Sequence, residues 1–224
     1  WYEKAAAQGD KEAQYNLGAL YANGAGVPQS DTMARQWYEK AAAQGNANAQ
    51  TNLGVLYDQG HGVSQDYTKA RQWYEQAATQ GDANAQINLG LLYDNGQGVP
   101  QDYKKAAQWY EQAATQGNAR AQFNLGMLYE HGQGVPQDYA AARGWYEKAA
   151  AQGDVNAQTN LGLLYDNGQG VPQDYSMARQ WWEKASAQGD AEAQNNLGTL
   201  YAFGRDVPQD YGKARQWYEK AAAQ

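Results

Sequence analysis

The sequence predicts an all-α fold, a solenoid of helix-turn-helix repeats with a 36-residue period. Two observations predict it. Tryptophan recurs at a fixed spacing, without an insertion or deletion, at positions 1, 37, 73, 109, 145, 181 and 217. A fixed period between about 20 and 50 residues is typical of repeat architectures. Within each period, apolar residues recur at helical spacing in two segments that a glycine-rich connector separates.

We expect one repeat array to cover residues 1–224. Residues 1–9 match only the tail of a repeat, so we interpret them as the remnant of a preceding repeat and the N-terminal edge as a truncation rather than a cap. Six repeats follow, numbered repeats 1 to 6: 10–45, 46–81, 82–117, 118–153, 154–189 and 190–224. Below, a position in any repeat carries the number of its equivalent in repeat 2.

The first helix of each repeat, helix A, is predicted from one apolar stripe. In repeat 2 the stripe follows the i, i+4, i+7, i+8 pattern of a helix face and consists of Ala49, Leu53, Leu56 and Tyr57. Asn46 precedes it as a favourable N-cap. Gly60 and Gly62 are expected to end the helix, because glycine accepts the left-handed conformation that closes helices.

The second helix, helix B, is predicted to begin after its N-cap Asp66 and to end at Gly81. Its apolar face consists of Tyr67, Ala70, Trp73, Tyr74, Ala77 and Ala78. Asp82 then caps the next helix A, so the link must be a tight antiparallel turn. Each buried aromatic ring contributes about 4–6 kcal/mol before entropy is subtracted, so aromatic residues should dominate a core whose stability is nearly additive over repeats.

The repeating pattern identifies a family. The segment from Ala49 to Gly81 has the pattern A-x-x-x-L-G-x-L-Y-x-x-G-x-G-V-x-Q-D-Y-x-K-A-x-x-W-Y-x-x-A-A-x-Q-G. This pattern strongly resembles the Sel1-like repeat, a relative of the tetratricopeptide repeat. The match covers essentially the whole chain. The resemblance implies a right-handed superhelix that acts as an adaptor or scaffold for protein complexes, mostly in bacteria, where many members are exported. It implies no shared catalytic site. One bacterial branch has cysteine pairs in its hairpins, and this chain has no cysteine.

Composition narrows the class of partner. The net charge is −7 and the pI is about 4.8, which argues against a nucleic-acid or polybasic membrane surface. No run of about twenty apolar residues predicts membrane insertion, and no signal-peptide pattern is present, so localisation stays open. We therefore expect another protein or peptide as the partner, with basic residues if charge steers it, and no cofactor.

The connector "DNGQGVPQDY" at 94–103 raises the question of a ligand loop. A phosphate loop needs Lys and Ser or Thr after its last glycine, whereas Val99 and Pro100 follow Gly98 here. A calcium loop needs alternating oxygen ligands and a glutamate at its twelfth position, and these are missing. We interpret the segment as a structural turn in which Asp102 caps helix B.

Catalytic residues are not apparent. The two histidines, His61 and His131, lie in different repeats without metal-binding spacing, and no G-x-S-x-G sequence occurs. Glu75 and Glu147 follow Arg71 and Arg143 by one helical turn. We interpret them as part of a solvated charged face of helix B. The sequence therefore predicts a protein that is not an enzyme.

The outward face of helix A is the predicted partner site, on the inner curve that the resemblance implies. Positions 51, 55 and 58 differ between repeats, and in repeats 3 to 5 they combine large apolar residues with an acidic edge. The predicted partner-binding residues are Ile87, Leu91, Asp94, Phe123, Met127, Glu130, Thr159, Leu163 and Asp166. Such a patch fits an apolar segment that carries Lys or Arg. The alternative is that these side chains pack between adjacent A helices.

Further alternatives stay open at this stage. Position 50 is always Gln and position 52 always Asn; these amides either satisfy backbone groups between helices or bind a partner's backbone. Many tyrosines suggest a carbohydrate or cell-wall binding module as the alternative function, although such a module needs exposed rings. Two repeats depart from the pattern: repeat 1 has Ser30 and Asp31 in place of Asp-Tyr, and repeat 6 has Phe203, Arg205 and Asp206 in its connector. The latter segment is either a second contact point or a degenerate repeat.

Overall fold

The computed structural model describes residues 2–224, so Trp1, the first of the regularly spaced tryptophans, lies outside the described residues. Within this range there are thirteen helices and no strand. The helices are α1 (Tyr2–Ala7), α2 (Lys11–Asn23), α3 (Asp31–Ala43), α4 (Ala47–Gln59), α5 (Tyr67–Thr79), α6 (Ala83–Asn95), α7 (Tyr103–Thr115), α8 (Ala119–His131), α9 (Tyr139–Ala151), α10 (Val155–Asn167), α11 (Tyr175–Ala187), α12 (Ala191–Phe203) and α13 (Tyr211–Ala222). The predicted all-α solenoid of helical repeats is confirmed.

Helix boundaries follow the predicted capping residues. The Asn46 side chain accepts a hydrogen bond from the backbone N–H of Ala49 at 2.8 Å, and Asp66 accepts one from Lys69 at 3.0 Å. Gly60 closes α4 in the left-handed region with φ of 73°. In repeat 1, Ser30 caps α3 by accepting from Met33 at 3.3 Å. These local bonds satisfy N–H and C=O groups that helix ends leave unpaired.

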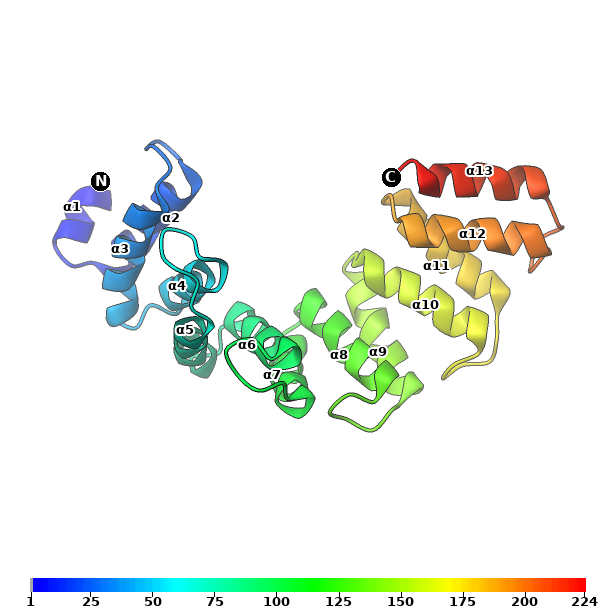
Figure 1. Cartoon of the computed structure of the whole chain (residues 1–224), viewed down its shortest axis with the longest axis horizontal. Coiled ribbons are helices and arrows are strands. Elements are labelled where there is room, and N and C mark those ends of the chain that lie inside the picture. The colour runs from blue at the N-terminus through cyan, green and yellow to red at the C-terminus, as the bar shows by residue number, and fades with distance from the viewer. Residues whose placement is uncertain (1) are drawn as a thin grey trace. The chain divides into compact units, whose positions relative to one another are not determined.

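The chain divides into two compact units, one ending at Gln116 and one covering Gly117–Gln224. Within each unit, helix A and helix B of a repeat pack as an antiparallel hairpin, for example α4 with α5 and α12 with α13 (Figure 1). Helix B also packs against helix A of the next repeat, as α5 does against α6. Each hairpin therefore has a neighbour on which to bury its second face.

In repeats 1 to 4 the most buried aromatic ring is the tyrosine at position 74 rather than the tryptophan at position 73. Tyr74 is completely buried, whereas Trp73 is half-buried against the core of the preceding repeat. A Cβ atom on Gly54 would collide with the Tyr74 ring. Glycine in the middle of helix A is thus explained by the close approach of this ring.

The glutamine at position 50 joins hairpins together. Gln50 is buried; its amide donates to the backbone carbonyl of Ala42 at 3.2 Å and its carbonyl accepts from the Gln80 side chain at 2.7 Å. Gln158 in the second unit makes the equivalent bonds to Ala150 and Gln188. For Gln50 and Gln158 the first interpretation is confirmed, because their amides satisfy backbone carbonyls between helices. Gln194 is also buried, but its amide has no hydrogen-bond partner among the described residues.

Candidate functional site

Grooves lie between successive A helices. In the first unit a cavity of about 270 Å³ opens between α2 and α4, and its lining includes Tyr15, Ala19, Ala22, Tyr38, Asn52 and Val55. In the second unit a smaller cavity of about 50 Å³ lies between α10 and α12. Positions 55 and 58 of helix A line both cavities, and the ring at position 74 of helix B forms part of both. The helix A face therefore borders a groove in each unit.

In repeats 2 to 4 a tyrosine hydroxyl of helix B meets a carboxylate of helix A. The Tyr74 hydroxyl donates to an Asp58 carboxylate oxygen at 3.2 Å and is hydrogen-bonded by Asn88 of the next repeat. Burial raises the pKa of Asp58, the Tyr74 hydrogen bond lowers it in part, and the pKa of Tyr74 is raised by burial and by the neighbouring carboxylate. The Tyr110 hydroxyl donates to Asp94 at 3.1 Å in the same way.

Repeat 4 repeats this arrangement in the second unit. The Tyr146 hydroxyl donates to Glu130 at 2.5 Å and accepts from the Asn160 amide at 3.1 Å. The Phe123 ring lies beside the Tyr146 ring, with centroids 5.8 Å apart. The hydroxyl is thus held between one acceptor and one donor that come from two successive A helices.

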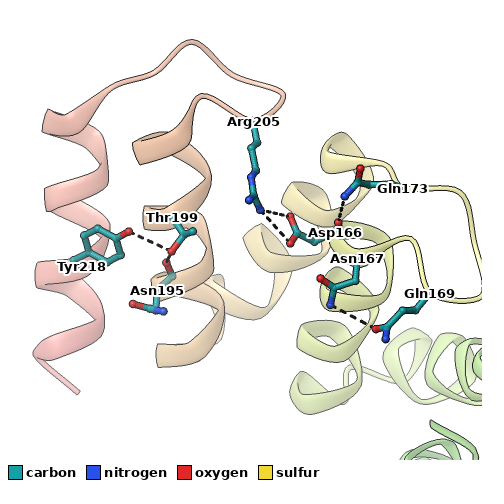
Figure 2. Close-up of polar contacts among 8 residues, drawn as sticks. All are labelled: Asp166, Asn167, Gln169, Gln173, Asn195, Thr199, Arg205 and Tyr218. Atoms are coloured by element: carbon teal, nitrogen blue, oxygen red, sulfur yellow. Dashed lines mark hydrogen bonds and ion pairs between the residues drawn. The ribbon is translucent and has the colours of Figure 1, made fainter.

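Repeat 5 breaks the arrangement. Trp182 stands where the other repeats have tyrosine, and its indole N–H donates to the Thr159 carbonyl at 3.2 Å. Asp166 instead accepts from Arg205, whose Nη1 lies 3.3 Å from each carboxylate oxygen. Figure 2 shows the arginine reaching from the connector after α12 to the end of α10. A cation from the next repeat has replaced the hydroxyl donor.

Two predicted site residues are not exposed. Ile87 and Thr159, both at position 51, are buried, with 3% and 2% of their surface accessible. The Thr159 hydroxyl donates to the N-cap carboxylate of Asp190 in the next repeat at 3.0 Å, as Thr51 does to Asp82 at 3.1 Å. Ile87 and Thr159 therefore face the adjacent hairpin, and the prediction that these two residues belong to an exposed patch is wrong.

The other predicted residues lie on the A helices with partial exposure, and two of them, Leu163 and Asp166, line the cavity between α10 and α12. Met127 is the most accessible of the apolar ones at 37%, and Leu91, Phe123 and Leu163 are half-buried. The carboxylates of Asp94, Glu130 and Asp166 are half-buried beside the hydrogen-bond donors described above. These seven residues belong to two units, and each unit presents its own groove.

Sequence reasoning missed the hydroxyl at position 74 and the role of position 52. The helical spacing places this tyrosine in the core through its ring and does not show what its hydroxyl contacts. A signal was present: position 52 is Asn throughout, position 58 is acidic in repeats 2 to 5, and position 74 changes to Trp only in repeat 5. The departure at Arg205 was noted, but its partner is 39 residues away in sequence.

The connector at 94–103 is held by its own hydrogen bonds. The Gln101 amide donates to the Asp94 carbonyl at 2.6 Å and to the Tyr103 hydroxyl at 2.8 Å. Asp102 caps α7 by accepting from the Lys105 backbone at 3.0 Å. Gly98 has a positive φ of 66°, and a Cβ there would lie 2.5 Å from the Tyr67 Cβ of the preceding repeat. The glycine is therefore required by both backbone conformation and close packing.

A family model for the Sel1 repeat matches residues 1–10, 11–46, 47–82, 83–118, 119–154, 155–190 and 191–224. The chain belongs to the Sel1 repeat family. A comparison with curated protein sequences gives no match. Sel1 repeat proteins are generally scaffolds for protein–protein interaction and generally non-catalytic.

Solved Sel1 repeat structures resemble this chain closely. The protective antigen c5321 of uropathogenic Escherichia coli is 41% identical with a TM-score of 0.94; the alignment covers 100% of this chain and 48% of that one, so this chain spans about half its length. A Sel1 repeat protein from Oxalobacter formigenes is 38% identical with a TM-score of 0.85, over 96% of this chain and 86% of that one. A Sel1 repeat protein from Klebsiella pneumoniae shares the fold, with 22% identity and a TM-score of 0.57. That alignment covers 99% of this chain and 97% of the other.

Membrane insertion finds no support in the helices. Among residues 2–224, none of the helices combines the length and the apolar character that crossing a bilayer demands. The helices of the repeats have at most 13 residues, whereas a spanning helix needs about 20.

Proposed function

We propose that this Sel1 repeat protein is a non-catalytic adaptor that binds another protein through the grooves of its helix A face and favours an apolar segment with basic residues. In the first unit the proposed contacts are Leu91 and Asp94. In the second unit they are Phe123, Met127, Glu130, Leu163 and Asp166, of which Asp166 is already paired with Arg205 and serves as a hydrogen-bond acceptor rather than as the partner of a cation. Each unit supplies a contact surface of its own, so the chain offers two places at which a short segment of a partner can bind.

The observation that supports this proposal is a half-buried carboxylate one turn from an apolar residue on successive A helices. Asp58 and Asp94 each accept a hydrogen bond from a neutral tyrosine, and in the described part of the chain neither forms an ion pair. A half-buried carboxylate without a cation favours a Lys or Arg from outside, because the ion pair offsets part of its desolvation. The neighbouring position 55 offers Val55 and Leu91 to the apolar part of the same segment.

Exposed aromatic rings, which the carbohydrate-binding alternative needs, are confined to one repeat of the described chain. Among side chains of the described residues, the exposed aromatic rings are Phe203, Tyr211 and Tyr218, all in repeat 6. Tyr15 and Tyr38, which border the groove of the first unit, are half-buried and buried, with ring centroids 6.0 Å apart. Sugar binding by stacking needs an accessible ring face, which these two rings do not offer.

A displayed library of random peptides tests the proposal. Peptides selected on the intact chain are expected to combine apolar residues with Lys or Arg, and their affinity should fall as salt rises. Met127→Lys should weaken peptides that bind the second unit about 10-fold or more, because it buries an ammonium in the contact and repels basic residues. Gln180→Lys, an exposed change on α11, is the matched control and should leave affinity unchanged.

Two results would contradict the proposal. If no peptide is enriched above background, the chain does not bind extended segments. If peptides are enriched but Met127→Lys and Gln180→Lys have the same effect, binding occurs elsewhere than the helix A face.

A further inference from the structure

Repeats 5 and 6 share a group of departures from the repeat pattern, and the structure brings them together. Trp182 replaces tyrosine, Phe203 replaces Asn, Gln or His, Arg205 replaces Gln, His or Ala, and Asp206 replaces glycine. The guanidinium carbon of Arg205 lies 5.2 Å from the Tyr175 ring centroid and 5.6 Å from that of Phe203. The two rings hold the arginine while it pairs with Asp166, so the changes form one structural group.

Asp206 completes this group. It has a φ of 60° and is the one non-glycine residue with a positive φ among the described residues. Its carboxylate accepts from Arg179 Nε at 3.0 Å, which ties the connector of repeat 6 to α11 of repeat 5. A left-handed aspartate costs more than glycine, and this ion pair offsets part of that cost. The connector that carries Arg205 is thus anchored on both sides.

These changes surround the place that a tyrosine hydroxyl occupies in the other repeats. In repeat 4 the Tyr146 hydroxyl donates to Glu130 and accepts from the Asn160 amide. The equivalents in repeats 5 and 6 are Asp166 and Asn196. Trp182 has no hydroxyl, and its indole N–H points to Thr159 instead. The carboxylate and the amide remain, but the protein supplies no hydroxyl between them.

A cavity lies at this place. Its volume is about 50 Å³, more than the roughly 10–15 Å³ of such space that a cavity needs to hold one water molecule. Its polar lining consists of Asp166, Asn196, Thr199 and Arg205, and its apolar lining of Leu163, Trp182 and Leu200. The Asn196 Nδ2 atom is buried and has no hydrogen-bond partner among the residues that the structure describes. An unpaired buried amide donor is costly, and a ligand acceptor would remove that cost.

The charges around the cavity select the group that it fits. Asp166 disfavours a carboxylate, and Arg205 disfavours an ammonium or guanidinium group. A neutral group that accepts a hydrogen bond from Asn196 and donates one to Asp166 suits both sides of the cavity. A hydroxyl can make both hydrogen bonds through a single oxygen atom. The small volume suits a short side chain better than a phenol, and the Leu163 and Trp182 side chains suit an aliphatic carbon beside the hydroxyl.

We propose that this cavity, called the repeat 5–6 pocket, binds the hydroxyl-bearing side chain of a Ser or Thr in a partner protein. The proposal rests on the proposed function, because it names one anchor residue of the segment that the helix A face binds. The partner hydroxyl takes the place of the tyrosine hydroxyl of repeat 4: it accepts from Asn196 and donates to Asp166. Thr199 keeps its own bonds to the Asn195 carbonyl and the Tyr218 hydroxyl (Figure 2).

Trp182→Tyr is the variant that tests the pocket. It restores the residue of the other five repeats, and the glycine beneath the ring, Gly162, has its equivalent in Gly126 beneath Tyr146. The variant is therefore expected to fold, and its own hydroxyl should fill the pocket. Displayed random peptides are selected in parallel on the intact chain and on Trp182→Tyr. Ser or Thr should be enriched at one peptide position on the intact chain alone.

A second measurement quantifies the hydroxyl. For a selected peptide, replacing that Ser or Thr by Ala should weaken binding to the intact chain about 10-fold and binding to Trp182→Tyr less than about 2-fold. Asn196→Ala removes the amide donor and leaves Trp182 in place, so it should also reduce the difference in affinity between the hydroxyl-bearing peptide and its Ala version. Tyr38→Phe removes a hydroxyl from the groove of the first unit. It is the control and should leave this difference in affinity unchanged.

The possible outcomes separate this inference from the proposed function. If peptides bind but show no hydroxyl preference, or the same preference on Trp182→Tyr and Asn196→Ala, the pocket inference is wrong and peptide binding stands. If no peptide binds the intact chain, both fail. A hydroxyl preference that disappears in both pocket variants and persists in Tyr38→Phe supports the assignment.

Discussion

The grooves at the two ends of the described chain differ although the same helices build them. Between α2 and α4 every lining residue is uncharged, position 58 is Ala22, and the cavity measures about 270 Å³. Between α10 and α12, Asp166 and Arg205 form an ion pair in the wall of a cavity of about 50 Å³. The comparison teaches that the repeat fixes where a groove lies, while a few side chains fix its size and charge.

The ring at position 74 shows the difference most clearly. Tyr38 presents a hydroxyl that is hydrogen-bonded by Asn52, and burial raises its pKa. Trp182 presents a larger ring whose polar atom is bonded to the backbone. The first groove therefore keeps a hydroxyl and lacks the carboxylate, whereas the second keeps the carboxylate and lacks the hydroxyl.

The largest expected effect comes from the glycine beneath each ring. Gly162→Ala would place a Cβ against the Trp182 indole nitrogen, and Gly18→Ala would place one 2.6 Å from the Tyr38 ring. Both should lower the free energy of unfolding by about 1–3 kcal/mol. Gly162→Ala should cost more, because the indole is tied to Thr159 and moves less freely. Urea unfolding followed by circular dichroism measures both.

Gly144→Ala is the matched control for these variants. Gly144 lies inside α9 with no atom near the Cβ that it would gain. Its substitution should stabilise the chain by about 0.5–1 kcal/mol through helix propensity alone. An equal loss of stability in all three variants would contradict the explanation based on ring contact.

Ala22→Asp should make the first groove resemble those of repeats 2 and 3. It supplies a carboxylate at position 58, where Asp58 and Asp94 accept hydrogen bonds from the Tyr74 and Tyr110 hydroxyls. Affinity for a lysine-containing apolar peptide should rise about fivefold at low salt, about 1 kcal/mol, and the gain should shrink as salt is added. Fluorescence anisotropy measures it. Ala22→Asn has the same shape without the charge, so an equal gain in that variant would show that charge is not the cause.

The smallest effect is a pH dependence that separates grooves with a carboxylate from the first one. The pKa values of Asp58 and Asp94 are raised by burial, so in the folded protein these carboxyls hold protons at a pH where the unfolded chain has released them. The stabilisation that these protonated carboxyls contribute is fully present below their pKa in the unfolded chain, near 3.8. It is lost as the pH rises through their raised pKa in the folded protein. In the double variant that combines Asp58→Asn and Asp94→Asn, the unfolding midpoint should change less with pH across this window than it does in the parent chain. An unchanged slope would exclude these two groups as the source.

Much of the fold was predictable because it depends on local chemistry. Asn46 and Asp66 cap their helices through bonds to residues three positions away, and Gly60 ends α4 through its own backbone freedom. The 36-residue period then implies that every hairpin repeats the same contacts. The site was predictable in part: position 55 and position 58 line the grooves, as expected of a face opposite the core stripe.

The sequence by itself determined the helices, their ends, the repeat and the family, since these follow from neighbours within a few residues and from periodicity. Tertiary structure alone decided that Ile87 and Thr159 are buried against the next hairpin, because a helical stripe does not show which neighbour covers it. It also decided that Asp166 pairs with Arg205 and that Trp182 leaves a cavity beside Asn196. Those contacts join residues from different repeats, and the free energy of burying a polar group depends on which partner the packing brings within reach.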